Sequence, residues 1–469
     1  MHFPHLHLRC MPQRYVVAIE LFLILMGCYM LRFSLSYAIP KMTKVEEAEK
    51  DPKACPFRDN ATRQEEEREN EFHWTAAQQG FIHAGCLFYG YIATQLVGGI
   101  LADLFNHKVV LMSGFITSVL CVLLTPAVTI LFDFIGLILI RVILGLAQGI
   151  TYCSMFTATM YWAPINERAL IGSLIFTGVH IGNIINGLLT GYLLVNFEWQ
   201  LVFYFYGIVS AFIAILFIFT TYTYPDQFPG LSEKEKAIFE EHKKNIEKKA
   251  GRKKIPFKAI LSNIHVWAIV IAAFGDDWAM YTQVVYLPSY LKRVQHIPID
   301  KVGYYMGAAF LLLWIYAMVT SPIADCLISK KILSISMARK IYYLIAAAGP
   351  SFAFLLIALG GCSEITSVIG LLVGYPVLGM FYPSVQVNAL DLSPNFAGTI
   401  GSIGNCGGCV AGLIVPQLIG FITPNNFLSE WRIAFLITSG MIMATGVLYF
   451  LMASGEVQEF DKYGQDEEK

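Results

Sequence analysis

The sequence is dominated by long apolar stretches, each with the length of a helix that crosses a lipid bilayer. A membrane-spanning helix needs about 20 consecutive, mainly apolar residues. Twelve segments meet this requirement: residues 15–39, 75–101, 109–129, 132–161, 170–195, 199–223, 263–290, 302–328, 340–360, 365–388, 397–422 and 431–453. The fourth and tenth segments are the least regular, and Pro376 and Pro383 interrupt the tenth.

The composition excludes a soluble protein. Hydrophobic residues make up 56% of the 469 residues and charged residues only 14%, whereas soluble domains carry about 25% charged residues. We therefore expect an all-α membrane protein with twelve transmembrane helices, and neither a cytosolic enzyme nor a disordered chain. A net charge of −1 gives no basic field for a nucleic-acid partner. The ten cysteines lie mostly in apolar runs and predict neither a metal site nor a disulfide framework.

Three hydrophilic segments divide the apolar ones. Residues 41–74 form a charged loop after the first span, residues 224–262 carry a lysine-rich run whose spacing allows one amphipathic surface helix, and residues 454–469 form a polar tail. We expect an N-terminal six-helix half over 1–223, a cytosolic linker at 224–262, a C-terminal half over 263–453 and a cytosolic tail.

The distribution of Lys and Arg predicts the orientation in the membrane. With both termini cytosolic, the inner side carries most of the Lys and Arg residues, as the positive-inside rule requires. The first loop is then extracellular or lumenal, and its Asn60-Ala61-Thr62 motif predicts glycosylation of Asn60. Cys55 and Cys362 both fall on this outer side, where a disulfide between them is one possibility.

Two segments of the chain repeat a local pattern. GGILADLFNHK places Asp103 and Lys108 after the second span, and TSPIADCLISK places Asp325 and Lys330 after the eighth. Each Asp can accept hydrogen bonds from the start of the next helix and neutralise the nearby base. Unrelated helix ends are the alternative, but parallel six-helix repeats build alternating-access carriers. The pattern predicts two pseudo-repeats around a central cavity, with these four residues in conformational loops.

The pattern G-G-x-x-A-D-x-x-x-x-K resembles the loop motif of the major facilitator superfamily. More specifically, the chain resembles its anion:cation symporter branch, which holds sialin, the vesicular glutamate transporters and the type I sodium–phosphate cotransporters. The matching stretches are FIHAGCLFYGYIATQLVGGILAD (81–103), IRVILGLAQGITY (140–152), YWAPINERALIG (161–172), VNALDLSP (387–394), FAGTIGSIGN (396–405) and ASGEVQEF (453–460). The resemblance implies that the first, fourth, seventh and tenth helices line the cavity.

Two arginines lie within apolar spans, Arg32 in the first and Arg141 in the fourth. An Arg at the centre of a membrane helix costs about 2.5–3.5 kcal/mol on insertion scales, so it must face a wet cavity or a partner. Its planar guanidinium suits a carboxylate or phosphate. The resemblance implies that both arginines bind a substrate anion, Arg141 most strongly. Snorkelling or a buried ion pair is the alternative.

Three further titratable residues are candidates for ion coupling. Asp276 and Asp277 are adjacent in the seventh span, point to different helix faces and suit a proton or sodium site; a salt bridge to an arginine is the alternative. His83 aligns with a histidine of the vesicular glutamate transporters and can relay a proton, or simply pack. These transporters also carry an arginine near Asp276, and its absence argues against a dicarboxylate amino acid as cargo.

The chain departs from the branch at two more positions. Gln148 stands where sialin and the glutamate transporters carry a glutamate implicated in proton coupling, and Gln cannot release a proton. Either the seventh-span aspartates replace it or the coupled ion is sodium. In the tenth span Ala389 replaces the histidine of an N-H-L-D motif, while Asn388 and Asp391 remain.

Aromatic and amide residues can complete the substrate site, although aromatic residues in spans more often pack in the core: Tyr89, Trp278, Tyr281, Tyr382, Gln386 and Asn388. We expect a secondary symporter of small anions, such as phosphate, an acidic sugar or another carboxylate, that needs no cofactor beyond co-transported Na⁺ or H⁺. It would be a monomer in the plasma membrane or in a lysosomal or vesicular membrane. A non-transporting receptor or scaffold on the same fold is the alternative; an enzyme is disfavoured.

Overall fold

The structure of the protein is a computed structural model that describes residues 11–43, 55–56, 71–82, 86–164, 167–250, 256–394 and 396–462. Within these ranges every regular element is a helix, which confirms the expected all-α class. The expected sites at Asn60 and His83 lie outside the described residues, as does the side chain of Asp103.

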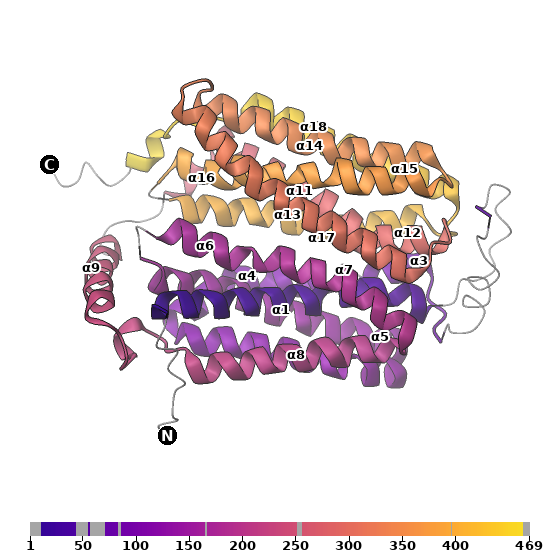
Figure 1. Cartoon of the computed structure of the whole chain (residues 1–469), viewed down its shortest axis with the longest axis horizontal. Coiled ribbons are helices and arrows are strands. Elements are labelled where there is room, and N and C mark those ends of the chain that lie inside the picture. Colours follow the sequence, from indigo (N-terminus) through magenta and orange to yellow (C-terminus); the bar gives the residue numbers. More distant parts are fainter. Residues whose placement is uncertain are drawn as a thin grey trace. The chain divides into compact units, whose positions relative to one another are not determined.

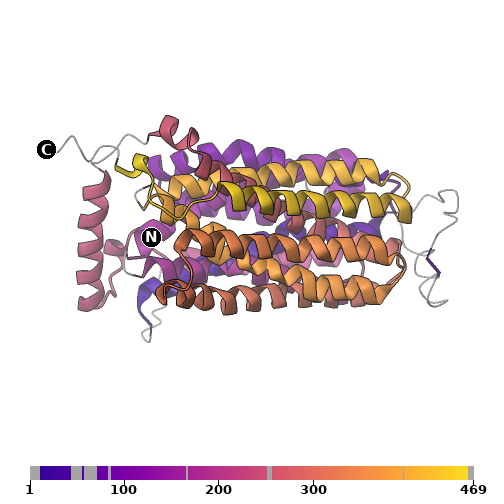
Figure 2. The same cartoon turned by 90° about the horizontal axis from the view of Figure 1, so that it is seen from above.

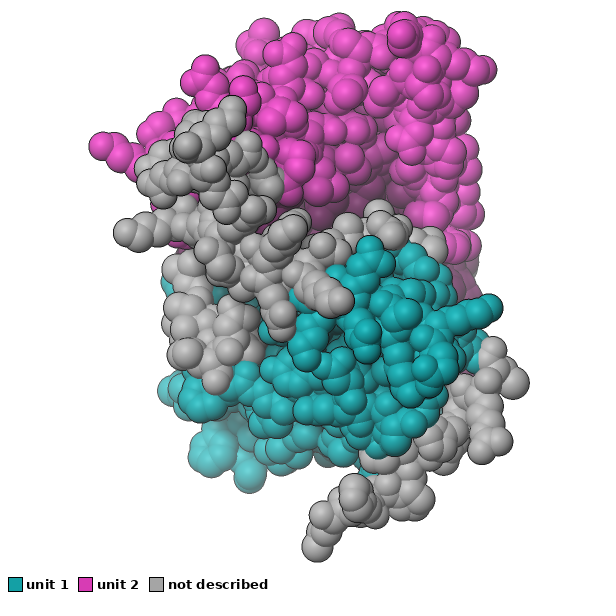
Figure 3. Space-filling view, turned by 90° about the vertical axis from the view of Figure 1, so that its left-hand side faces the viewer, with its two compact units in different colours: residues 1–35, 86–186, 196–253 teal, residues 36–85, 187–195, 254–469 magenta. Residues whose placement is uncertain are grey.

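The chain forms two compact units, coloured separately in Figure 3. The first unit comprises residues 1–35, 86–186 and 196–253. Its helices are the first part of α1 (Gln13–Met42), α4 (Cys86–Leu104), α5 (His107–Trp162), α6 (Arg168–Phe176), most of α7 (Gly178–Asn196), α8 (Trp199–Thr220), η2 (Pro225–Gln227) and α9 (Glu233–Ala250). In Figure 1 its long helices run in roughly the same direction.

The second unit comprises residues 36–85, 187–195 and 254–469, and therefore includes the last turns of α1 and part of α7. Its other helices are α3 (Ala76–Gly80), α10 (Phe257–Leu261), α11 (Ile264–Tyr281), η3 (Thr282–Tyr286), α12 (Leu287–Arg293), α13 (Ile299–Ser329), α14 (Ile335–Gly360), α15 (Glu364–Ile369), η4 (Gly370–Gly374), η5 (Tyr375–Phe381), η6 (Tyr382–Gln386), α16 (Val387–Leu392), α17 (Ala397–Ile422), α18 (Leu428–Met452) and η7 (Glu459–Lys462).

The longest helix, α5, is a hairpin of two spans. Its 56 residues would extend about 84 Å at 1.5 Å per residue, far more than a bilayer core of about 30 Å. The backbone leaves the helical region at Asp133 (φ 48°, ψ −138°). The two arms then pack together, because a Cβ added at Gly114 would lie 2.4 Å from Thr151 Oγ1. The predicted spans 109–129 and 132–161 are these two arms.

The remaining spans also agree with the sequence. In the described part of the chain, nine helices are long and apolar enough to cross a membrane, with α5 counted once. The predicted second span is divided between α3 and α4, and the predicted seventh span consists of α11, η3 and α12. This arrangement is consistent with twelve spans.

Irregular turns occupy the tenth span. Residues 370–386 form two π-helical turns, η4 and η6, on either side of the 3₁₀ segment η5. Pro376 and Pro383 lie in this stretch and lack the backbone N–H that a regular helix needs. In these turns the side-chain directions depart from those of a regular helix. Since π-helical turns occur frequently at functional sites, the tenth span is a candidate functional segment.

The central hydrophilic segment contains the expected amphipathic helix, α9. Figures 1 and 2 both show it lying crosswise to the long helices of its unit. The ring of Phe239 lies 5.8 Å from that of Trp162, and His242 Nε2 lies 2.9 Å from the carbonyl oxygen of Met160. The apolar face of α9 is thus held against the C-terminal end of α5.

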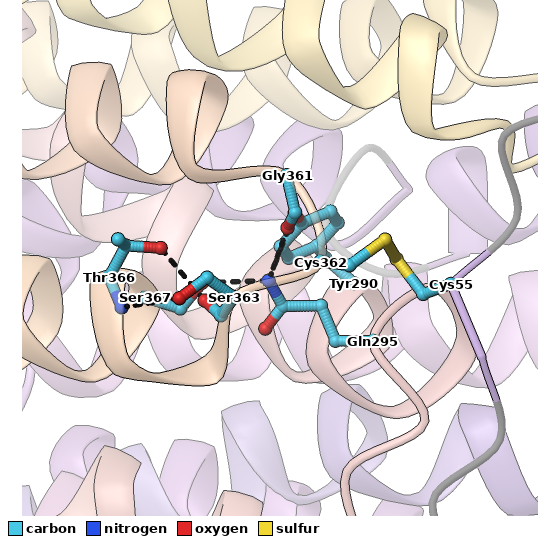
Figure 4. Close-up of a disulfide and its surroundings, with 8 residues drawn as sticks. All are labelled: Cys55, Tyr290, Gln295, Gly361, Cys362, Ser363, Thr366 and Ser367. Carbon is cyan, nitrogen blue, oxygen red and sulfur yellow. Dashed lines mark hydrogen bonds between the residues drawn. A yellow bond between two sulfur atoms is a disulfide. The ribbon is translucent and has the colours of Figure 1, made fainter.

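A disulfide joins Cys55 in the first hydrophilic loop to Cys362 in the turn between α14 and α15 (Figure 4). Two hydrogen bonds from Gln295 hold this turn: its Nε2 donates to Gly361 O at 2.7 Å and to Ser367 Oγ at 2.9 Å. Gly361 has a φ of +58°, a conformation that favours glycine. The disulfide therefore anchors the loop to a well-fixed turn of the second unit.

Candidate functional site

Arg32 on α1 and Gln148 on α5 form the centre of a polar site inside the first unit. Both side chains are buried, and Arg32 Nε donates to Gln148 Oε1 at 2.8 Å. Gln148 Nε2 in turn donates to the carbonyl oxygen of Cys28 at 3.0 Å. A neutral amide thus orients the guanidinium from position 148, where a glutamate would have supplied a compensating negative charge.

Two aromatic rings flank the same guanidinium. The Arg32 guanidinium carbon lies 5.0 Å from the ring centroid of Tyr29 and 4.6 Å from that of Tyr91. A cation within about 6 Å of an aromatic face is stabilised by the ring quadrupole. The rings therefore help to hold a positive charge in the apolar interior without neutralising it.

Arg141 on the second arm of α5 joins this site from the other side. Its Nη1 and Nη2 both donate to the backbone carbonyl oxygen of Arg32, at 3.1 Å each. The two guanidinium groups are close enough to repel each other electrostatically. The structure thus brings together, inside the first unit, the two arginines that the sequence singled out.

A narrow hollow, too small to hold a water molecule in this conformation, lies beside Arg32. It is lined by apolar, aromatic and hydroxyl side chains together with Arg32 and Gln148: Leu25, Cys28, Tyr29, Thr151, Tyr152 and Met155. Among these described residues, Arg32 is the only charged one. The lining thus places one guanidinium group among mainly apolar side chains.

The other residues expected around the substrate lie in varied surroundings. Tyr89 on α4 is 49% exposed and is not among the residues that line the hollow. In the second unit, Gln386 is exposed, Tyr382 is half-buried and Tyr281 is buried. Asn388 is fully buried and donates to Tyr449 Oη at 2.9 Å, which ties α16 to α18.

Trp278 and the two aspartates lie on α11. Trp278 is buried and donates from Nε1 to Thr438 Oγ1 at 3.3 Å. Asp276 and Asp277 are both half-buried. Asp277 fits against Gly408 of α17, where an added Cβ would lie 1.8 Å from its Oδ2.

Two tyrosines complete the surroundings of these aspartates. Tyr343 and Tyr375 lie within electrostatic reach of both carboxylates. Tyr343 donates its hydroxyl to Ala272 O at 2.7 Å, whereas the buried hydroxyl of Tyr375 has no hydrogen-bond partner among the described residues. Within the second unit the aspartates thus lie near the Tyr375 hydroxyl, whose proton is not committed to another described acceptor.

The loop residues of the two repeats differ in their contacts. Lys108 donates from Nζ to the carbonyl oxygens of Ile218, at 3.1 Å, and Thr221, and so caps the C-terminal end of α8. Asp325 and Lys330 are exposed. In the second unit Arg339 instead forms a buried ion pair with Asp391, with Nε 2.8 Å from Oδ2.

Sequence reasoning missed two ionisable residues, Arg339 and Glu20. Glu20 lies in α1, is 5% exposed and accepts hydrogen bonds from the hydroxyl groups of Thr220 and Thr221. The signal was available, because Glu20 is a single carboxylate in the long apolar run of the first span. For Arg339 the signal was Asp391, the aspartate that remains of the N-H-L-D motif, because a carboxylate at a membrane span needs a basic partner.

Comparison with known proteins decides the family. Residues 21–416 match the Major Facilitator Superfamily. The chain belongs to the Major Facilitator Superfamily. Human sialin is 30% identical over 96% of this chain and 91% of its own length. A putative inorganic phosphate cotransporter from Drosophila melanogaster is 31% identical over 98% of the chain and 88% of its own length.

Within the Major Facilitator Superfamily the chain is thus a member of the branch that contains sialin, the vesicular glutamate transporters and the phosphate cotransporters. It is a transporter and not an enzyme. Its fold resembles that of a bacterial homolog of the human lysosomal transporter Spinster in an inward-facing and unoccupied conformation, with a TM-score of 0.67, 16% identity and coverage of 94% of this chain and 97% of the other.

Proposed function

We propose that this superfamily member is a secondary active symporter that moves small organic or inorganic anions by alternating access, coupled to H⁺ or Na⁺. The observation that carries the proposal is the joined pair of Arg141 and Arg32. Two like charges held in one buried place create a positive potential. A negatively charged guest relieves that repulsion when it binds.

The cargo follows from this chemistry and from the names of the relatives. Phosphate, an acidic sugar and other carboxylates all offer the oxygen pair that a guanidinium binds in a fork. Relatives are described as sialin and as an inorganic phosphate cotransporter, which supports an anionic cargo for this chain.

The coupled ion would bind at Asp276 and Asp277. Gln148 cannot exchange a proton, so the role of the branch's glutamate must pass to another carboxylate. Asp276 and Asp277 are adjacent, partly exposed and near two tyrosine hydroxyls. Neutralising these carboxylates with H⁺ or Na⁺ lowers the cost of moving them between two conformations.

The orientation of the chain is supported by the disulfide. Disulfides persist in extracellular or lumenal compartments and are rare in the cytosol. The Cys55–Cys362 bond therefore favours an outer location for the first hydrophilic loop, and with it two cytosolic termini. The same location would expose Asn60 to glycosylation. We propose a monomer in the plasma membrane or in a lysosomal or vesicular membrane.

Flux measurements in proteoliposomes test the proposal. Labelled phosphate, an acidic sugar and a simple carboxylate would be offered with pH and sodium gradients imposed separately. Arg141→Ala should abolish flux, whereas Lys301→Ala, which removes an exposed cation from α13, should leave it unchanged. Unchanged flux in Arg141→Ala would refute the anion site. Anion binding without any flux would instead favour the receptor alternative.

A further inference from the structure

Glu20 is a carboxylate that the proposed mechanism does not use. It is 5% exposed within α1, in the same unit as Arg32 and Arg141. At about 1.5 Å per residue it lies about 18 Å along the helix from Arg32, toward the end that is predicted to be cytosolic. A buried ionisable residue within a membrane span is costly, and such residues commonly mark proton or ion pathways.

Two hydroxyl groups at the end of α8 contact the Glu20 carboxyl group. Thr221 Oγ1 bonds to one of its oxygens and Thr220 Oγ1 to the other. Thr220 Oγ1 also lies 2.7 Å from the carbonyl oxygen of Leu216, one helical turn earlier. A single hydroxyl group therefore faces two acceptors, the backbone carbonyl and the carboxyl group.

Counting protons separates two states of this contact. A threonine hydroxyl carries one proton and can donate only one hydrogen bond at a time. If Thr220 donates to Leu216 O, its oxygen must accept from Glu20, and the carboxyl group must then carry a proton. If Glu20 is ionised, Thr220 donates to Glu20 and releases Leu216 O. The two arrangements differ by one proton on Glu20.

The two states differ in the electrostatic attraction between Glu20 and Lys108. Its ammonium group is the charged group that acts on Glu20, and it donates to the carbonyl oxygens of Ile218 and Thr221. The neighbouring His107 is buried and stacks on Tyr161, with 5.1 Å between ring centroids. An ionised Glu20 attracts Lys108 and ties α1 to α5 and α8 by charge. A protonated Glu20 keeps the hydroxyl contacts but loses this attraction.

We propose that Glu20 is a proton-binding site that takes H⁺ from the aqueous phase at this end of the first unit. Binding forms one O–H bond on the carboxyl group, which then donates a hydrogen bond to Thr220 Oγ1, while Thr220 keeps its own proton and donates a hydrogen bond to Leu216 O. The electrostatic attraction to Lys108 is lost, which loosens the contact among α1, α5 and α8. This proposal rests on the proposed transport function and adds a proton-sensitive contact to it.

Infrared difference spectroscopy between acidic and alkaline pH tests the site directly. The unmodified protein should show the carbonyl band of protonated carboxylic acids, and Glu20→Gln should remove one component of that band while the components of other carboxyl groups, such as Asp276 and Asp277, remain. Glu233→Gln, at an exposed carboxylate on α9, should keep the component that Glu20→Gln removes. A band of unchanged intensity in Glu20→Gln would overturn the proposal.

A transport measurement accompanies the spectra. The rate of anion counterflow should depend on the pH at this face in the unmodified protein, and Glu20→Gln should flatten that dependence. An unchanged pH profile would contradict the proposed role. If the unmodified protein shows no counterflow, the transport function fails, while the infrared band still decides whether Glu20 binds a proton.

A second variant serves if Glu20→Gln does not fold. Thr220→Val keeps the size of the side chain and removes the hydroxyl that stabilises the ionised carboxylate. The carboxylic acid band should then persist but disappear only at a higher pH than in the unmodified protein. An unshifted titration would show that Thr220 takes no part in the proton site.

Discussion

Gln148 accepts a hydrogen bond from Arg32 Nε at 2.8 Å, and its own amide N–H donates a hydrogen bond to Cys28 O. The bond spans two helices that are far apart in the sequence. It leaves the Arg32 guanidinium oriented by a neutral partner at the position where related transporters carry a glutamate. The consequence is a specific expectation for the charge at position 148.

Gln148→Glu should weaken anion binding at neutral pH. The new carboxylate would pair with Arg32 and compete with the substrate, and a hydrogen bond to a charged group is worth about 1.5–3 kcal/mol. We expect the KM for the anion to rise by about tenfold or more, since 1.4 kcal/mol corresponds to a factor of ten. As the pH falls and the glutamate becomes protonated, the KM should recover.

Uptake kinetics as a function of pH check this expectation. Gln148→Leu is the matched control, because it removes the same hydrogen bond without adding a charge, and its KM should show no such recovery at low pH. A KM that is insensitive to Gln148→Glu would mean that the anion does not bind at Arg32.

The contact between Arg32 and Gln148 also shows what the sequence can and cannot reveal. The apolar segments located the spans, and the rarity of arginine in such segments identified Arg32 and Arg141. The partners of these arginines lie more than 100 residues away and depend on how α1 packs against α5. Sequence reasoning therefore located the two buried arginines, but not the neutral groups that contact them.

Other misses have local physical causes. The proton count at Glu20 depends on a hydroxyl that faces two acceptors, which only coordinates reveal. Gln386 is exposed at the end of the π-helical turn η6, and the departure of such a turn from a regular 3.6-residue period is not readable from the sequence. The role of Lys108 as a cap on α8 likewise depends on a contact between distant helices.

Removing the disulfide should lower the thermal stability of the purified protein. Disulfides typically contribute about 2–4 kcal/mol, and this one closes a loop between residues 307 positions apart. Cys55→Ser with Cys362→Ser should reduce the unfolding temperature in detergent, and a reductant should have the same effect on the unmodified protein. Cys326→Ser, at an exposed free thiol, is the control and should leave the unfolding temperature unchanged.

Glu167 should make the stability of the first unit depend on pH. Arg14 donates to it with Nε at 2.7 Å, and this hydrogen bond lowers the pKa of the Glu167 carboxyl group below its usual value of 4.5. A depressed pKa in the folded state means that the contribution is complete above the unfolded pKa and is lost as the pH falls through the folded pKa. Glu167→Gln should therefore destabilise the protein at neutral pH but not in strong acid.

Thermal unfolding in detergent at several pH values measures this difference. Glu198→Gln, at an exposed carboxylate before α8, is the control and should unfold like the unmodified protein at each pH. An equal loss of stability at neutral and acidic pH would show that the ion pair with Arg14 is not the cause.

Gly408 should be required for ion coupling, because it leaves the space that Asp277 occupies. An added Cβ would lie 1.8 Å from Asp277 Oδ2, so Gly408→Ala must displace the carboxylate. Counterflow of the anion, which needs no ion gradient, should persist, while gradient-driven accumulation should fall sharply. Gly401→Ala on the same helix is the matched control, since a Cβ there meets nothing within 4 Å and alanine favours the helix. Full accumulation in Gly408→Ala would place the coupled ion away from Asp277, whereas a loss of counterflow as well would assign Gly408 to the packing of α11 against α17.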